Sequence, residues 1–301
     1  MTQTGHAAST KGKLEESLNK GFTITAEIPP PKSANAEKNL SVASEVRDLL
    51  TAVNVTDNQR GMMRMSALAF SHLLVQEGCE PLLQLCCRDR NRLALESDLI
   101  GAAALGIRNI CVMTGDYTTL GDRPGAKPVY DLDSVQLLRL VSGLTGGVYG
   151  DGKNLKQGLP FFVGAVVNPF YDPIELELLK VGKKIAAGAG FFQTQPFFDI
   201  ASLDGFLEKI KEFDTKFLIG VTPLKSAKMI RFLNEKVLTS PIPDEIERRI
   251  NGAADPAKEG LKVASEFVNE IRGRVDGVHL MPIGQVDKLP ELLVMIGDER
   301  G

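Results

Sequence analysis

The 301-residue sequence has no long hydrophobic run, little histidine and no excess of charge of one sign. No apolar stretch approaches the roughly 20 residues that a membrane-spanning helix needs. Residues 1–13 lack the apolar core of a signal peptide, so we expect a cytoplasmic protein. Lys and Arg number 35 against 38 Asp and Glu, which gives no positive charge excess for binding a phosphate backbone. We therefore expect neither membrane nor nucleic-acid partners.

Cysteine and histidine are too few and too scattered to predict a metal site. The four cysteines, Cys79, Cys86, Cys87 and Cys111, do not form the C-x-x-C spacing of a zinc knuckle or redox pair. His279 stands alone in a strand-like segment, where histidine is more often hydrogen-bonded core than a metal ligand. The hydrolase motif G-x-S-x-G is also absent. We predict no metal and interpret the cysteines as small buried hydrophobic residues in a reducing compartment.

Strand-like and helix-like segments alternate along most of the sequence. The expected strands are 22–28, 52–56, 81–87, 109–114, 161–167, 191–195, 217–221 and 277–282. The expected helices are 34–50, 63–77, 92–105, 134–144, 174–187, 202–213 and 225–237, with an extra helical stretch at 244–272. This alternation indicates parallel strands joined by crossovers. We predict an α/β fold, a single (β/α)8 TIM-type barrel with an extra helical segment before the last strand.

The domain organisation follows from length and composition. With 43% hydrophobic residues the chain can bury a large core, and one barrel accounts for its length. We expect a flexible N-terminal tail at residues 1–13 and a barrel catalytic domain at residues 14–301. A doubly wound sheet is the alternative, but no G-x-G-x-x-G follows the first strand, where a dinucleotide-binding domain would carry it.

Glu27 is the first of three polar side chains that interrupt apolar strand-like segments. In a parallel barrel, chemistry sits at the carboxyl ends of the strands. Alternation along residues 22–28 places Glu27 opposite its apolar neighbours, toward the barrel interior. A carboxyl group there loses solvation, which favours the protonated form that a general acid requires. An interior Glu paired with Lys or Arg is an alternative of equal weight.

Asp116 and Gln195 are the other two. Asp116 follows Gly115, which can supply unusual backbone geometry and direct the carboxylate to the mouth of the barrel. Taken alone, Asp116 would be interpreted as a turn cap. Gln195 lies in FFQTQPFFD, where an amide can exchange hydrogen bonds inside an apolar pocket. The neighbouring rings can flank a flat ligand, although such phenylalanines are more often core.

With these residues in this order, the sequence resembles the methylenetetrahydrofolate reductase family over nearly its whole length. The shared features are AEIPPPKS at the first strand, MTGD at the fourth, AAGAGFFQTQPFFD at the sixth and GVTPLKSAKMIRFLNEKV at the seventh. TQPFFD is the most specific of them, whereas Gly-Asp after a strand is weak by itself. The likeness is closer to short bacterial forms than to longer eukaryotic enzymes with a regulatory domain.

The resemblance implies a flavoprotein oxidoreductase of one-carbon metabolism and methionine biosynthesis. Such an enzyme reduces 5,10-methylenetetrahydrofolate to 5-methyltetrahydrofolate or catalyses the reverse. Glu27 then resembles the family's general acid, Asp116 its carboxylate on the flavin and folate sides, and Gln195 its substrate-orienting amide. A proton from Glu27 would open the five-membered ring of the folate, and an ionised Asp116 would stabilise the resulting cation.

The implied cofactor is FAD, with FMN left open. Family positions on the flavin side align with Thr56, Gln84, Thr114, Gly115, Asp116, Asn168, Glu177 and Lys184. Lys184 suits a phosphate and Glu177 suits ribose hydroxyls, although an exposed helix face also explains both. Relatives place His at position 84, Arg at position 114, and tyrosine and histidine where this chain has VVNPFYDP. These departures leave the nucleotide contacts open.

The electron donor and the alternative functions also stay open. Family members take electrons from NADH or NADPH, or from an iron-sulfur partner subunit, and this chain has no cysteine cluster for such a relay. We expect folate as substrate and a homo-oligomer or hetero-oligomer. The alternative is a pterin-binding methyltransferase or a non-catalytic folate-binding barrel, since these also bury pterins. A metal-dependent aldolase-type barrel lacks a ligand set.

Overall fold

A computed structural model describes residues 11–298, and within this range parallel strands close into a barrel in the order β1 to β8. The strands are β1 (Thr23–Glu27), β2 (Ala52–Val55), β3 (Pro81–Cys86), β4 (Asn109–Met113), β5 (Phe162–Val167), β6 (Phe191–Pro196), β7 (Lys216–Val221) and β8 (Gly277–Leu280). Closure comes from the pairing of β8 with β1, through Thr25 opposite His279. The predicted TIM-type barrel is confirmed, and an open doubly wound sheet is excluded.

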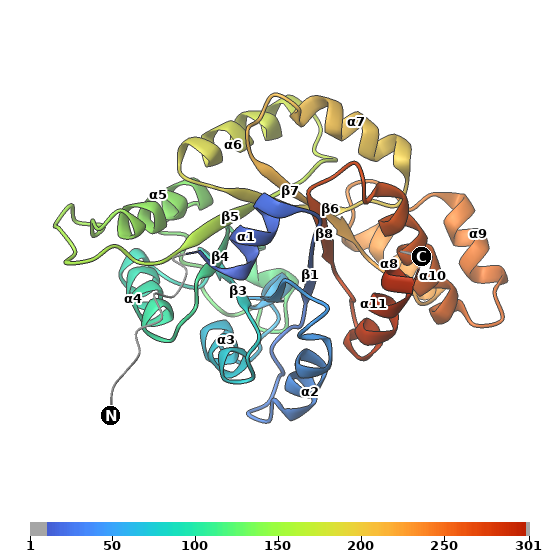
Figure 1. Ribbon diagram of the computed structural model, residues 1–301, viewed down its shortest axis with the longest axis horizontal. Coiled ribbons are helices and arrows are strands. Elements are labelled where there is room, and N and C mark those ends of the chain that lie inside the picture. Colours follow the sequence, from blue (N-terminus) through green and yellow to red (C-terminus); the bar gives the residue numbers. More distant parts are fainter. Residues whose placement is uncertain (1–10, 299–301) are drawn as a thin grey trace.

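Helices surround the strands on the outside of the barrel (Figure 1). They are α2 (Glu37–Val46), α3 (Ala67–Gln76), α4 (Arg92–Ala104), α5 (Ser134–Thr145), α6 (Ile174–Ala186), α7 (Ile200–Ile210), α8 (Ala227–Lys236), α9 (Asp244–Gly252), α10 (Pro256–Ile271) and α11 (Leu289–Asp298). The extra helical segment before β8 is confirmed, but it is two helices and not one. The two helices are separate because Asp255 caps the start of α10. Its side chain accepts hydrogen bonds from the first turn of α10, which begins with Pro256.

The two faces of each strand have different environments. On β1, Ile24 and Ala26 belong to the main hydrophobic core together with Val42 and Ala43 of α2. Thr25, between them, faces the opposite way and contacts His279 of β8. Side-chain alternation therefore directs the odd-numbered residues of β1, including Glu27, toward the barrel interior. The orientation expected for Glu27 is confirmed.

A short helix that the sequence analysis did not predict, α1 (Lys13–Lys20), closes the amino end of the barrel. Its Leu14 and Leu18 are buried against interior side chains of five strands, Ala52, Leu82, Cys111, Phe191 and Leu218. The Glu80 carboxylate, just before β3, accepts hydrogen bonds from Lys13 N at 2.9 Å and Leu14 N at 3.1 Å. Figure 1 shows α1 over the middle of the strands. A ligand therefore has the carboxyl end of the barrel available to it.

The remaining sequence expectations about the chain as a whole are met in part. Residues 1–10 of the expected tail lie outside the described residues, and the boundary at residue 13 stays a prediction. All four cysteines are free and buried, as the interpretation of them as core residues expects. Burial raises the pKa of the Cys111 thiol to about 12, so it stays protonated. Within residues 11–298, no helix is both long and apolar enough to span a membrane.

Candidate functional site

A pair of amides lies across the middle of the barrel interior. Asn54 of β2 and Gln193 of β6 exchange two side-chain hydrogen bonds, each of 3.0 Å, and both residues are buried. Because each amide satisfies the other, this pair is a fixed polar layer between the apolar residues above α1 and the carboxyl end of the strands. Inward-facing side chains that follow this layer lie at the carboxyl end of the barrel.

Glu27, the last residue of β1, is one of these side chains and is only 7% exposed. Its Oε1 lies 3.6 Å from His279 Nε2, and its Oε2 accepts a 3.4 Å hydrogen bond from Gln59 Nε2. His279 Nδ1 in turn lies 3.0 Å from the Thr25 hydroxyl. In the part of the chain that the structure describes, Glu27 has no ion pair with Lys or Arg. The alternative of a structural Glu–Lys or Glu–Arg pair is therefore wrong.

Gln59 is a neighbour of Glu27 that the sequence analysis missed. It begins the short helix η1 (Gln59–Gly61), which follows β2, and it stands between two non-glycine residues with positive φ. Asn58 has φ 48° and Arg60 has φ 56°. Such backbone is uncommon for residues other than glycine and clusters at functional sites. No motif in the sequence marks Gln59, because its contact joins the segment after β2 to Glu27 at the end of β1, 32 residues away in the sequence.

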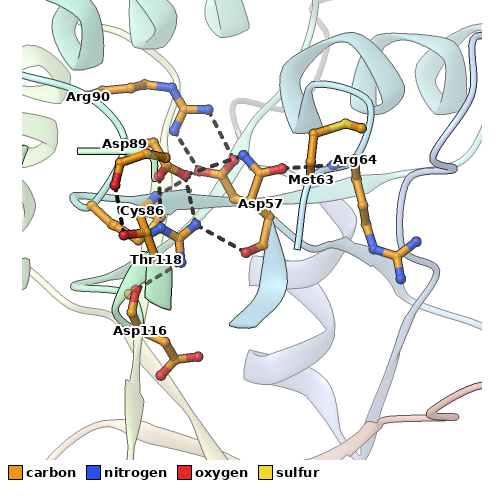
Figure 2. Close-up of polar contacts among 12 residues, drawn as sticks. Asp57, Met63, Arg64, Cys86, Asp89, Arg90, Asp116 and Thr118 are labelled. Carbon is orange, nitrogen blue, oxygen red and sulfur yellow. Dashed lines mark hydrogen bonds and ion pairs between the residues drawn. The ribbon is translucent and has the colours of Figure 1, made fainter. Parts of the chain in front are cut away.

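Asp116 lies in the loop after β4, and its side chain is exposed. Gly115 before it has φ +91°, and a Cβ atom there would collide with Cys86 Sγ. The unusual backbone geometry expected at Gly115 is confirmed. Beside Asp116 lies a cluster of charged residues that includes Asp57, Asp89 and Arg90. In Figure 2 the Asp116 side chain points away from this cluster. Its main-chain carbonyl, in contrast, faces that cluster and accepts a hydrogen bond from Arg88 Nη1 at 3.1 Å.

Asp57 and Arg90 form the other side of this cluster (Figure 2). The Asp57 carboxylate follows β2 and accepts two hydrogen bonds from the Arg90 guanidinium, at 2.6 and 3.0 Å. It also accepts one from Cys86 N at 3.0 Å. Arg90 completes its contacts with Asp98 on α4, at 2.9 Å. This forked ion pair joins the ends of β2 and β3 and is almost fully shielded on the Asp57 side.

Gln195 differs from its expected environment. It lies in β6 but is exposed, so the expectation of an amide inside an apolar pocket is wrong. The register of β6 against β7 shifts between Gln193 and Pro196, and Gly220 N donates to the Thr194 side chain. The ladder is therefore interrupted at Thr194 and Gln195 and resumes where Pro196 pairs with Gly220, so Gln195 lies in the irregular stretch near the carboxyl end of the strand. Phe191, Phe192 and Phe197 are buried, so their interpretation as core is correct.

Two threonine hydroxyls at the carboxyl end lack a partner. Thr56, directly after β2, is 0% exposed, and Thr222, directly after β7, is 3% exposed. Among residues 11–298 neither Oγ1 finds a hydrogen-bond partner. Buried polar atoms are nearly always hydrogen-bonded, so each such atom requires an explanation. Thr56 was expected to contact a cofactor, whereas Thr222 was not singled out.

The remaining expected cofactor residues lie around β3, β4 and β5. Gln84 is buried in β3, and Thr114 is exposed after β4. Asn168, at the end of β5, donates from its amide to the Thr239 hydroxyl at 3.1 Å. Its backbone N donates to Glu177 Oε1 at 3.1 Å. These contacts attach the loop after β5 both to α6 and to the segment that follows α8.

Glu177 and Lys184 are both buried, each 6% exposed. Their interpretation as an exposed helix face is therefore wrong, because both lie on the face of α6 that covers the end of β5. Lys184 Nζ donates to the carbonyl of Val166 at 2.6 Å. Burial lowers the pKa of this ammonium group. Its charge is thus already held against the protein backbone.

The parallel barrel brings the expected residues of the strands and their loops to one end. Glu27, Thr56, Gly115, Asp116, Asn168 and Gln195 all stand at or just beyond the carboxyl end of a strand. Glu177 and Lys184 join them only from outside, through β5. Among the residues described, no group of three or more His, Cys, Asp or Glu is placed to hold a metal ion. The site offers carboxyl, amide and hydroxyl groups for a polar organic ligand.

The chain is similar in sequence to proteins of a known family. Residues 13–297 match the family described as Methylenetetrahydrofolate reductase. The chain is 24% identical over 229 residues to a protein of Caenorhabditis elegans described as a probable methylenetetrahydrofolate reductase (NADPH). That match covers 73% of this chain and 33% of the relative, so the chain spans about a third of the relative's length.

Solved structures with the same fold include a protein of Clostridium thermocellum described as binding two copies of 5-methyl-5,6,7,8-tetrahydrofolic acid. It has a TM-score of 0.66 and 14% identity, over 95% of this chain and 98% of that chain. Tryptophan synthase of Mycobacterium tuberculosis has a TM-score of 0.55 and 10% identity, over 95% and 94% of the two chains. At such low identity these likenesses show the barrel fold alone.

Proposed function

Because the chain belongs to the methylenetetrahydrofolate reductase family, we propose that it interconverts 5,10-methylenetetrahydrofolate and 5-methyltetrahydrofolate with a bound flavin. The observation that carries the proposal is the position of Glu27. It is a buried carboxyl group at the carboxyl end of β1, held by His279 and Gln59 and without a Lys or Arg partner in residues 11–298. That environment suits a group that donates a proton.

Glu27 is the proposed general acid. Opening the five-membered ring of methylenetetrahydrofolate requires a proton on the departing nitrogen, and a carboxyl group shielded from water delivers it efficiently. The contacts with His279 Nε2 and Gln59 Nε2 fix the direction of the two carboxyl oxygens. The Glu27 carboxyl group is thereby held in one orientation at the carboxyl end of the barrel.

Asp116 and Gln195 are the proposed partners of the substrate. The exposed carboxylate of Asp116 is available to a bound pterin and favours the cation that forms when the ring opens. The exposed amide of Gln195 can both donate to and accept from the same ring system. Both lie at the end of the barrel where Glu27 lies, which supports a shared substrate.

The flavin is the proposed cofactor, FAD first and FMN second. When bound, a reduced flavin supplies the hydride for the one-carbon group. The unpartnered hydroxyl of Thr56 fits such a group, since it is a buried hydrogen-bonding atom at the carboxyl end of β2. Gln84, Thr114, Gly115, Asp116 and Asn168 are the further proposed contacts. Glu177 and Lys184 hold the end of β5 and contribute to cofactor binding through that loop.

The electron donor and the assembly are further parts of the proposal. NADH or NADPH is one proposed donor, and an iron-sulfur partner subunit is the other. Purification of the native protein decides between them. A single subunit that is fully active with a nicotinamide excludes the partner, whereas activity that requires a co-purifying iron-sulfur protein establishes it. The subunit composition of the active species also tests the expected homo-oligomer or hetero-oligomer.

A folate-binding barrel without redox chemistry, or a pterin-binding methyltransferase, is the second candidate. It is favoured by one comparison, the Clostridium thermocellum protein described as binding two copies of 5-methyl-5,6,7,8-tetrahydrofolic acid. The same carboxyl and amide groups suit folate in either case. The two functions differ in whether the chain holds a flavin.

The deciding experiment is an anaerobic absorption spectrum of the purified protein, followed by mixing of its reduced form with methylenetetrahydrofolate. A yellow protein whose reduced flavin is reoxidised by the folate supports the reductase. A colourless protein that binds 5-methyltetrahydrofolate and takes up neither FAD nor FMN supports the second candidate. Chromatography of the flavin released on denaturation distinguishes FAD from FMN.

A further inference from the structure

Arg88, two residues beyond β3, is a fully buried arginine, only 1% exposed. Its guanidinium forms a fork with the carboxylate of Asp89, with Nε to Oδ1 at 2.8 Å and Nη2 to Oδ2 at 2.7 Å. A buried charge needs such a partner, and this pair provides it. The fork occupies one edge of the guanidinium and leaves further donor hydrogens for other contacts.

The remaining contacts of Arg88 go to the main chains of two loops. Nη2 donates to the carbonyl of Asn58 and Nη1 to the carbonyl of Asp116, each at 3.1 Å. The first carbonyl directly precedes Gln59, whose amide contacts Glu27. The second is the main-chain carbonyl of Asp116, the residue whose carboxylate is proposed to contact folate. One guanidinium therefore holds the backbone of the loop that carries Gln59 and the backbone of the loop that carries Asp116.

Both loops are shaped to this contact. A Cβ at Gly115, whose φ is +91°, would lie 3.2 Å from Arg88 Cβ, so the turn before Asp116 rests directly on the arginine. Asn58 has φ 48°, and its side chain donates to Asp89 Oδ2 at 3.3 Å. The Tyr130 hydroxyl donates to the carbonyl of Gly115 at 3.1 Å. Unusual backbone on two loops thus converges on one ion pair, in which Arg88 is buried and Asp89 is partly exposed.

The neighbouring Arg90 offers a contrast. It is also mostly buried and is held by two carboxylates, Asp57 and Asp98. Within residues 11–298, the Arg90 guanidinium donates hydrogen bonds to the Asp57 side-chain oxygens and to no loop carbonyl. Arg90 thus joins β2, β3 and α4, whereas Arg88 joins the loops that carry Gln59 and Asp116.

We propose that Arg88 is a positioning residue for folate, because it fixes the Asp116 carboxylate and the Gln59 amide relative to each other through their main chains. The inference rests on the proposed function, since it requires that folate lies between these groups. Lysine cannot replace arginine here, because one ammonium group lacks the planar fork that serves Asp89 and two separate carbonyls at once.

The test compares Arg88→Lys with the matched control Arg90→Lys. Three quantities are measured on each purified variant: the melting temperature, amide hydrogen exchange of the peptides covering 58–65 and 115–122, and the affinity for 5-methyltetrahydrofolate by calorimetry. We expect both variants to lose thermal stability. Only Arg88→Lys should raise exchange in both peptides together and weaken folate binding, by about tenfold, since the interacting groups lose their preorganisation.

The folate half-reaction gives a further readout. In Arg88→Lys, reoxidation of the reduced protein by methylenetetrahydrofolate should slow by about 10²-fold, because small displacements of reacting groups cost that much. Arg90→Lys should keep the wild-type rate. Equal loss of folate affinity in the two variants, in proportion to their loss of stability, would overturn the positioning role.

Two further outcomes are kept distinct. If Arg88→Lys does not fold, Asp89→Asn takes its place, because it keeps the shape but removes the charge that orients the guanidinium. It should shift the same two peptides and weaken folate binding, and unchanged binding would overturn the inference. A wild-type protein that binds no folate overturns the proposed function itself. Wild-type binding with no difference between the variants overturns only the role of Arg88.

Discussion

At the residue scale, the proposed site depends on a buried carboxyl group whose neighbours are neutral side chains or an imidazole. Glu27 contacts Gln59 and His279, and the imidazole contacts Thr25 on its other side. A carboxylate in the barrel wall that served only the fold would instead be expected to have a basic partner. The arrangement therefore favours a chemical role for Glu27.

Glu27→Gln should separate the two half-reactions. The amide keeps the size and the contacts of the side chain but carries no transferable proton. We expect flavin content and flavin reduction by the donor to stay near wild type, while the rate with methylenetetrahydrofolate falls by about 10²–10⁴-fold. Stopped-flow measurement of each half-reaction checks this. The control is Glu80→Gln at the amino end, which contacts α1 and should alter stability only. Equal slowing of both half-reactions in Glu27→Gln would refute the role.

Thr56→Val tests the unpartnered hydroxyl after β2. Valine has nearly the same shape, so the flavin-free protein should be as stable as wild type or more stable by about 1 kcal/mol, since an unsatisfied group is removed. Flavin affinity should fall by about 3- to 10-fold, the value of one hydrogen bond. Thr215→Val is the matched control, because the Thr215 hydroxyl also lacks a partner in residues 11–298 but precedes β7, at the opposite end. Unchanged flavin affinity in Thr56→Val would exclude the contact.

Single residues were predictable from the sequence where a local pattern determines them. Strand alternation alone places Glu27 in the interior, and Gly before Asp indicates the turn at Asp116. Gln59 and Arg88 were not predictable in this way, because their roles come from contacts between segments. Gln59 contacts Glu27 at the end of β1, and Arg88 contacts Asn58 and Asp116 in the loops after β2 and β4. Spacing along one segment carries no information about such contacts.

At the element scale, the carboxyl-side loops of β2 and β4 are packed against each other. The short helices η1 and η2 (Thr118–Leu120) meet where Gly61 and Gly121 come together, with no space for a Cβ at Gly121. The Asp122 carboxylate also accepts hydrogen bonds from Met63 N and Lys32 Nζ, each at 2.8 Å. The position of Gln59 therefore depends on the loop that follows β4.

Gly121→Ala should disturb this contact without affecting the barrel. The added Cβ would meet the carbonyl of Gly61, so η1 has to shift and Gln59 with it. We expect weaker binding of 5-methyltetrahydrofolate, by about tenfold, and little change in the far-ultraviolet circular dichroism spectrum. Gly125→Ala in the same loop is the control, since its Cβ would meet nothing within 4 Å. Equal affinities of the two variants would show that this packing does not position the site.

Elements with strong periodicity were predicted well, and those without it were missed. Eight strands and the helices between them follow from alternation and turn residues, because burial on two faces leaves a clear hydrophobic pattern. Helix α1 has only two apolar residues, Leu14 and Leu18, and its place at the end of the barrel depends on their contacts with distant strands. The break between α9 and α10 lies at Ala253, which is extended, and at Asp255, which caps α10, whereas the sequence pattern indicated the whole stretch as one helical segment.

At the scale of the whole molecule, the two ends of the barrel have different tasks. The amino end is closed by α1, whose Leu14 and Leu18 complete an apolar layer beneath the Asn54–Gln193 pair. The carboxyl end carries the polar groups of the proposed site. In barrels of this type the first end serves stability and the second function. A change at the amino end should therefore affect folding without affecting the chemistry.

Leu14→Ala tests this separation. The side chain is 0% exposed and contacts the barrel interior, so truncation leaves a cavity that should cost about 2–5 kcal/mol of the free energy of unfolding. Urea denaturation measures this loss, with Leu93→Ala on α4 as the control, because Leu93 is 77% exposed and should change stability by less than about 0.5 kcal/mol. Folded Leu14→Ala should keep the wild-type flavin spectrum and folate affinity. If these change while the protein stays folded, the two ends are coupled, and the assignment of separate tasks is wrong.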